Sequence, residues 1–244
     1  MTTFEHPFFH YHAAAYAFSG ELLRPVRRLI EVQAGISLPF TGGQGRSNVD
    51  NFSLDHVLTF RRGYSHLSGS KGPKGNHTSH TTAVIEGLNV LDVLTADRVV
   101  ARLTSDHDPV KREGHIVAVG SRFENLRISG CEVKVELDHG LLIQHTTHGD
   151  LAKNVATLKQ SGRMAIDSNG VVICSLAKKV EVNCPGVEVE GHVVTVRHFG
   201  KIFLGEVFSL EGTKSVAMMR LELGSPQDAQ LVAAGGTVDG HPWP

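Results

Sequence analysis

The sequence predicts an all-β protein, either an antiparallel β-barrel or a β-sandwich, with one short helix near residues 150–161. Three observations support this fold class. Valine is abundant and the chain has 26 glycines, a composition that favours strands and tight turns. Stretches with a two-residue hydrophobic period recur about every ten residues. The helices that would connect parallel strands are missing between these stretches, so the sheets should be antiparallel.

The first strand is predicted at residues 8–23. Its bulky side chains, from Phe8 through Tyr16 to Phe18, share one parity, while mostly alanines occupy the other. This alternation is typical of a strand with one bulky and one small face. Further strands are expected at 28–38, 52–69 and 81–104, separated by glycine-rich loops at 39–48 and 71–80.

The clearest alternation lies at residues 132–138, where Val133, Val135 and Leu137 alternate with charged residues. One face of this strand should be buried and the other solvated. Later strands are expected at 171–176, 179–182, 187–190, 192–198, 201–210 and 215–223. The tail, residues 225–244, has no clear period, and we expect it to be loosely structured.

The single helix is predicted from a different period. Leu151, Val155 and Leu158 recur at the spacing of one helical face, Asp150 can cap the start, and Gly162 can end the helix. We therefore expect one continuous helix over 150–161.

Composition limits the domain organisation and the partners. The 244 residues should form a single β-rich domain over 1–244, with a two-lobed arrangement joined near 140–165 as the alternative. The 24 basic and 25 acidic residues give a formal net charge of −1, so a nucleic-acid partner has no support. Neither a signal-peptide pattern nor a membrane-length apolar run occurs, so we expect a cytoplasmic protein with no membrane partner.

The three cysteines, Cys131, Cys174 and Cys184, lack the close spacing of zinc or redox motifs. We expect them to be reduced and mostly buried, because free cysteine packs as a small hydrophobic side chain.

No motif identifies a reaction: the zincin, serine-hydrolase, P-loop and dinucleotide-binding patterns are all absent. His10 and His12 lie two residues apart on one strand face, a spacing that can chelate a metal ion. Because no third ligand is fixed by the sequence, we expect no metal and no cofactor. A position at a solvent-facing or subunit-facing strand end is the alternative role for this pair.

Acidic residues at apolar positions give a more specific indication of a site. Glu86 and Asp92 lie in a stretch that is apolar on both parities, and Glu206 lies among the apolar residues 202–210. His198 shares a face with Val194 and Val196. A buried acid must be paired, hydrogen-bonded or protonated, and such groups concentrate at functional sites. The alternative is a change of parity at Gly87 or Gly205 that exposes the acids.

Two functions from different classes fit these observations. The first is a β-barrel that binds a small apolar or aromatic molecule. A histidine and carboxylate pair could make it a proton-transfer enzyme, that is, an isomerase, cyclase or hydrolase. The candidate catalytic residues are Glu86, His198 and Glu206, and the candidate ligand-binding residues are His10, His12, Tyr16 and Asp92. The second is a non-catalytic interaction or assembly protein that forms a homo-oligomer through exposed strand edges and clustered histidines. The sequence does not decide between them.

Overall fold

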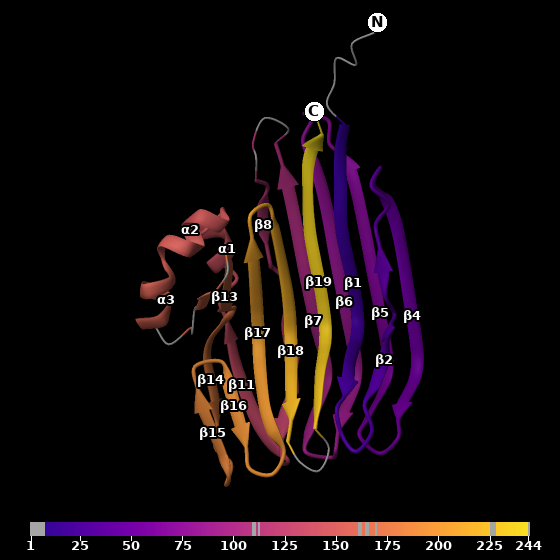
Figure 1. Cartoon of the computed structure of the whole chain (residues 1–244), viewed down its shortest axis with the longest axis vertical. Coiled ribbons are helices and arrows are strands. Elements are labelled where there is room, and N and C mark those ends of the chain that lie inside the picture. The colour runs from indigo at the N-terminus through magenta and orange to yellow at the C-terminus, as the bar shows by residue number, and fades with distance from the viewer. Residues whose placement is uncertain are drawn as a thin grey trace, which may run out of the picture.

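The prediction of an all-β antiparallel protein is confirmed (Figure 1). The computed structural model describes residues 8–108, 111, 113–160, 163, 166–168, 170–224 and 228–243. Within these residues, the strands form one ten-stranded and one nine-stranded sheet. Each sheet runs from one edge strand to another, and the described strands form no closed barrel.

The main path of the ten-stranded sheet has the order β12 (Ile166–Ser168), β13 (Val171–Ser175), β17 (Gly200–Leu210), β18 (Thr213–Leu223), β19 (Ala229–Trp243), β1 (Phe8–Leu22) and β2 (Arg28–Gln33). Three short strands join this path at its sides: β3 (Ile36–Ser37) on β1, β16 (Val193–Val196) on β17, and β15 (Val187–Glu190) on β16.

The nine-stranded sheet has the order β14 (Ala177–Val182), β11 (Cys131–Leu137), β10 (Arg127–Ile128), β7 (Leu94–His107), β6 (His77–Val90), β5 (Leu58–Lys71) and β4 (Gly43–Leu54). The short strands β8 (His115–Val117) and β9 (Arg122–Glu124) both pair with β7.

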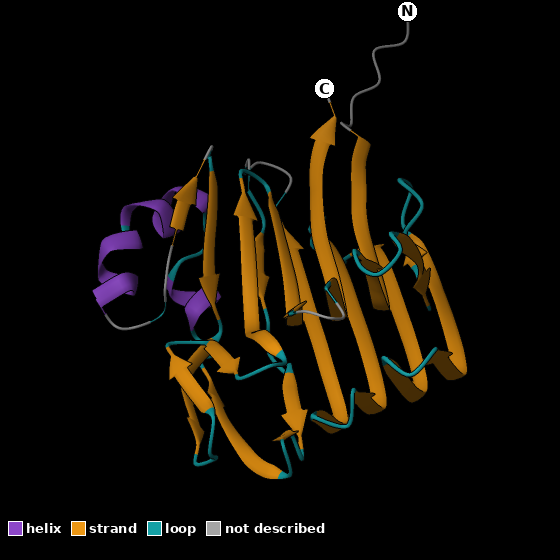
Figure 2. Ribbon diagram, turned by 60° about the horizontal axis from the view of Figure 1, so that its bottom comes forward, coloured by secondary structure: helices purple, strands orange, loops and turns teal. Residues whose placement is uncertain are grey.

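The two sheets face each other, with β1 and β19 packed across β5, β6 and β7 (Figures 1 and 2). The core lies between them. Its aromatic part is formed by Phe18 of β1, whose ring centroid lies 6.0 Å from that of Phe52 and 6.2 Å from that of Phe60.

The prediction of a loosely structured tail is wrong, because residues 229–243 form the strand β19 between β18 and β1. The small residues that obscured its period have a packing role. A Cβ atom at Gly235 would lie 2.3 Å from Cζ of Tyr16, and one at Gly240 would lie 2.2 Å from Cζ of Phe9. Glycine is therefore required where the large side chains of β1 cross the neighbouring backbone.

The expected loops at 39–48 and 71–80 are shorter than predicted, because β4 already begins at Gly43 and β6 at His77. Both segments are rich in polar residues on an exposed strand face. The two-residue period is weak where neither face carries a run of large apolar side chains.

The expected single helix is also wrong. The segment forms α2 (His148–Lys153) and α3 (Val155–Gln160), and a further short helix, α1 (Leu141–Gln144), precedes them. The break falls at Asn154, whose side-chain Nδ2 donates to the Asp150 carbonyl at 2.8 Å. Thr147 rather than Asp150 caps α2, with Asp150 completing a capping box. The expected stop at Gly162 lies outside the described residues. The longest of these described helices has six residues, too few to span a membrane.

The prediction of three reduced thiols is wrong for two of them. Cys131 and Cys184 form a disulfide with a Cα–Cα distance of 5.9 Å, and only Cys174 is a free, buried thiol. The disulfide continues the antiparallel register of β11 and β14, in which Val133 is opposite Val182. It therefore links the two strands of this ladder at its end, just before the chain continues into β15 and β16 of the other sheet.

In one strand of each sheet, the alternation of inward and outward side chains is reversed at a glycine. In β6, Ile85 and Leu88 are buried in the core, whereas Glu86 and Gly87 between them are both turned outward. Gly87 has a φ of +65°, a conformation that favours glycine, and Gly205 of β17 has the same φ. The parity change is confirmed at both positions, but it exposes only one acid. Glu86 meets solvent, while Glu206 stays buried on the outer face of its sheet.

Candidate functional site

The predicted catalytic residues do not converge. Glu86 lies on the nine-stranded sheet, while Glu206 lies on the ten-stranded sheet. His198 is an exposed residue of the turn between β16 and β17, with a φ of +63°. Asp92 is exposed in the turn between β6 and β7, where the Nδ2 atom of Asn89 donates to its carboxylate at 2.7 Å. These positions do not form the single cavity that the sequence predicts.

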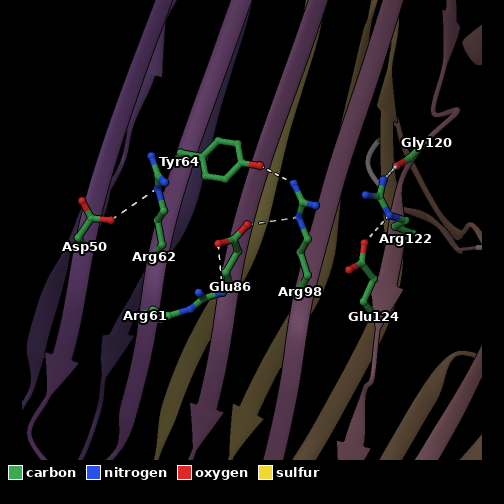
Figure 3. A network of polar contacts seen from close by, with 9 residues as sticks. All are labelled: Asp50, Arg61, Arg62, Tyr64, Glu86, Arg98, Gly120, Arg122 and Glu124. Carbon is green, nitrogen blue, oxygen red and sulfur yellow. Dashed lines mark hydrogen bonds and ion pairs between the residues drawn. The ribbon is translucent and has the colours of Figure 1, made fainter.

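Glu86 belongs to a chain of ion pairs on the outer face of the nine-stranded sheet (Figure 3). Its carboxylate lies 3.3 Å from Nη2 of Arg61 and 3.6 Å from Nε of Arg98. Arg98 also donates to the Tyr64 hydroxyl at 2.5 Å. Two arginines therefore balance the charge of Glu86, and this arrangement is typical of a solvated strand face rather than an acid held ready for catalysis.

A Glu86→Gln variant should consequently lose no more than about 1 kcal/mol of unfolding free energy, because exposed ion pairs contribute little. Urea unfolding of the wild type and the variant would measure the difference. A loss of several kcal/mol would show that the Arg61 and Arg98 contacts are much stronger than their exposure indicates.

His10 and His12 lie near the start of β1. His10 is half-buried with its ring centroid 5.5 Å from that of Phe40, and His12 is exposed. Among the described residues, no group of three histidine, cysteine, aspartate or glutamate side chains could hold a metal ion. The structure therefore adds no third ligand to this pair.

Glu206 is the centre of a buried polar cluster that sequence reasoning found only in part. Arg220 of β18 binds its carboxylate with two hydrogen bonds, from Nε at 2.6 Å and from Nη2 at 3.0 Å. The remaining Nη1 of Arg220 donates to Glu222 at 2.5 Å. The Arg220 guanidinium also covers the ring of Phe203, with Cζ 3.6 Å from the centroid. Arg220 is therefore fixed in place and its charge is matched by two carboxylates.

His192 completes this cluster from the turn of the β15–β16 hairpin. Its carbonyl accepts from the Leu204 amide at 3.1 Å, which fixes its backbone beside β17. The side chain is 3% exposed, as is Glu206. Nε2 of His192 lies 3.5 Å from Oε1 of Glu206, within ion-pair distance but long for a hydrogen bond, and neither ring nitrogen has a hydrogen-bond partner in the described chain. An unsatisfied buried ring nitrogen is costly and calls for an explanation.

The cluster borders a hollow of about 270 Å³ with mostly apolar walls, formed by Ile173, His192, Val193, Phe203, Glu206, Phe208 and Arg220. A second hollow of about 250 Å³ shares Phe208 and Arg220 with it and is lined on its far side by Tyr16. Two of the residues predicted from sequence, Glu206 and Tyr16, thus line adjoining hollows. Burial raises the pKa of the Tyr16 phenol, although a hydrogen bond with Ser19 opposes the shift.

The charges around Glu206 and His192 give these two residues different roles. Burial by itself would raise the pKa of Glu206, but its contacts with His192 and Arg220 outweigh that effect and hold the pKa below its ordinary value. Glu206 is therefore an ionised carboxylate that accepts from its neighbours. A carboxylate beside Nε2 favours the tautomer with its proton on Nε2, which leaves the lone pair on Nδ1.

A larger cavity, about 740 Å³, lies elsewhere and has charged walls, formed by Lys74, Asn76, Asp106, Asp108, Lys111, Glu113, Gly114, His115, Thr146 and Thr147. Beside it, Lys214 is buried and donates to the Thr146 carbonyl at 2.7 Å, and burial lowers its pKa. Glu113 accepts from the backbone amide of His148 at 2.8 Å. These contacts position the segment that leads into α2. Ligand sites are more often apolar with a few placed polar groups, as at His192.

Sequence reasoning missed His192 and Arg220, although one signal was present. Arg220 is a charged residue inside the apolar run 216–223, the same feature that marked Glu206. His192 gave no such signal, because it follows Gly191 at a hairpin turn where a polar residue is ordinary.

Neither the curated proteins nor the solved structures contain a significant match to this chain. One family model does match, over residues 9–160 and 152–210, which together cover most of the sequence. The chain therefore belongs to the family described as a domain of unknown function, DUF8256.

Proposed function

We propose that the protein binds a small, mainly apolar molecule in the hollow beside His192 and exchanges a proton with it through that residue. One observation carries the proposal: a buried imidazole, whose two ring nitrogens both lack a hydrogen-bond partner in the described chain, lines an apolar hollow and lies next to an ionised carboxylate. A bound molecule with one hydrogen-bonding group would supply the partner that Nδ1 lacks.

The chemistry follows from the charges of the cluster. Glu206 orients the imidazole, so it is a positioning residue, and Nδ1 of His192 is the group that accepts the proton. Arg220 has no excess charge to offer, because Glu206 and Glu222 both bind it. The ligand should therefore be uncharged, and the reaction should be a proton transfer such as an isomerisation.

The experiment uses two uncharged probes with wild-type protein and a His192→Gln variant. Binding of naphthol, followed by its fluorescence, should weaken at least tenfold in the variant, which corresponds to about 1.4 kcal/mol. Exchange of the α-protons of benzylacetone in D₂O should be accelerated by the wild type. In that step a C–H proton passes to Nδ1, the C–H electron pair forms the enolate, and a deuteron returns to the carbon.

The matched control is His198→Gln, which changes a histidine in the exposed turn of the same hairpin region. This variant should bind naphthol and exchange benzylacetone like the wild type. Equal behaviour of the wild type and the His192 variant in both assays would refute the proposal, and a loss in the His198 variant alone would move the base to that residue.

A second candidate function, homo-oligomeric assembly, is favoured by the edge strand β2. Leu29 and Val32 on this strand are 78% and 57% exposed, and Val26 just before it is 73% exposed. Exposed apolar side chains on an edge strand are typical of an association surface. Sedimentation velocity would test this function: a dimer that Val26→Lys and Val32→Lys both dissociate would support it, and a monomer at high concentration would exclude it.

A further inference from the structure

The hollow beside His192 is one end of a longer groove on the outer face of the ten-stranded sheet. The orientation of Ala17 shows that this is the outer face. Ala17 points inward at Gly63 of the other sheet, so the neighbouring Tyr16 points outward. The first two hollows share Phe208 and Arg220. A third hollow, of about 380 Å³, shares Arg220 and Val232 with the second. Arg220 lines all three hollows, so they adjoin one another on this face of the sheet, and we call them together the outer groove.

The outer groove is mostly apolar, and two of its charged residues, Arg220 and Glu21, are in ion pairs. Phe203 and Phe208 line its first part, Tyr16 and Val232 its middle, and Leu29 its far part. Arg220 is bound by Glu206 and Glu222. At the far end, Glu21 accepts from Arg27 at 2.5 Å. Glu31, which is exposed on β2, is a further charged residue at the far end. An uncharged apolar chain can lie along the groove without breaking the contacts of Arg220 and Glu21.

The two ends of the groove differ. At one end lies His192, whose two buried ring nitrogens both lack a hydrogen-bond partner in the described chain. At the other end the groove opens at the edge strand β2, where Leu29 and Val32 are mostly exposed. From β17 to β2 the sheet has four strand spacings, which amount to roughly 19 Å at the usual distance between neighbouring strands. That length suits a long hydrocarbon chain rather than a compact ring.

We infer that the outer groove takes a long-chain amphiphile with one uncharged hydrogen-bonding headgroup, such as a primary fatty alcohol. The headgroup lies at Nδ1 of His192, and the chain crosses β17, β18, β19 and β1 to cover Leu29 and Val32 on β2. This inference rests on the proposed ligand site at His192 and names the class of its ligand.

The test compares hexadecanol with octanol, each titrated below its aggregation limit into wild-type protein in a calorimeter. The short alcohol reaches only the first hollows, whereas the long one also covers β2. We expect hexadecanol to bind at least tenfold more tightly than octanol. Val32→Lys should remove that advantage without changing octanol binding, and Val26→Lys should change neither, because Val26 is more exposed than Val32 but does not line the groove.

The outcomes separate this inference from the proposed function. If octanol binds and depends on His192, but hexadecanol binds no more tightly, the proposed site stands and the long-chain inference fails. If neither alcohol binds the wild type, the ligand site itself is refuted. A dimer that persists with hexadecanol and is dissociated by both lysine variants would show that a second copy covers β2, and would also overturn the inference.

Discussion

Replacing Cys184 with serine should lower the free energy of unfolding by about 4 kcal/mol, because the disulfide with Cys131 closes a loop of 53 residues in the unfolded chain. The bond also lies at the end of the β11–β14 ladder, next to the segment that carries β15, β16 and His192 into the other sheet. The variant should therefore unfold at a lower denaturant concentration and bind naphthol more weakly, since the hairpin that positions His192 is less restrained. Guanidinium unfolding without reductant measures the first effect.

A double-mutant cycle supplies the control. Cys131→Ser should cost as much as Cys184→Ser, and the variant with both changes should cost little more than either alone. Cys174 should not take part, because burial raises the pKa of its thiol to about 12 and leaves it unreactive in the folded protein. If reductant leaves the unfolding midpoint of the wild type unchanged, the stabilising role of the disulfide is refuted.

A Glu206→Gln variant should lose about 3 kcal/mol of unfolding free energy at pH 7, because it breaks a buried ion pair from one side and leaves Arg220 with Glu222 alone. The contrast with Glu86→Gln is informative, since both acids contact two basic side chains but only Glu206 is buried. Arg220→Met together with Glu206→Gln should cost less than the sum of the two single changes. Additive losses would show that the two side chains do not interact.

The pH dependence of the same contact has a definite sign. The pKa of Glu206 is lower in the folded protein than its ordinary value of about 4.3, so the contact stabilises the fold fully above that pH. The stability is lost as the pH falls through the lower, folded pKa. The difference between wild type and Glu206→Gln should therefore stay constant from pH 7 to about pH 5 and shrink below about pH 4. A difference that grows on acidification would mean that the carboxyl is protonated in the folded state.

Local periodicity was sufficient for much of the secondary structure. The strand at 8–23 is β1 almost to the residue, and the alternation at 132–138 is β11. These strands have one face in the core, so every second residue is apolar and the two-residue period can be read from the sequence. The helical segment was located correctly, but its break was not predicted. The break depends on the Asn154 side chain, which donates to the Asp150 carbonyl, and the hydrophobic period carries no signal of that hydrogen bond.

The site was harder to predict, because its residues come together only in the folded sheets. Glu206 was identified from the cost of burying an acid, a property of the residue and its immediate neighbours. Its partners were not, since Arg220 and His192 reach it from other strands of the sheet. The pairing of Cys131 with Cys184 likewise depends on the register of β11 with β14.

By itself, then, the sequence determined that this is an antiparallel β protein and that Glu206 needs a partner, because period and burial cost are local properties of the chain. The tertiary structure decided which face each acid occupies. Gly87 and Gly205 adopt a positive φ inside a strand, and this reverses the parity of every residue beyond them. Glu206 is buried at one end of the outer groove, in a hollow that Phe203 and Phe208 also line, whereas Glu86 lies on the solvated outer face of the other sheet.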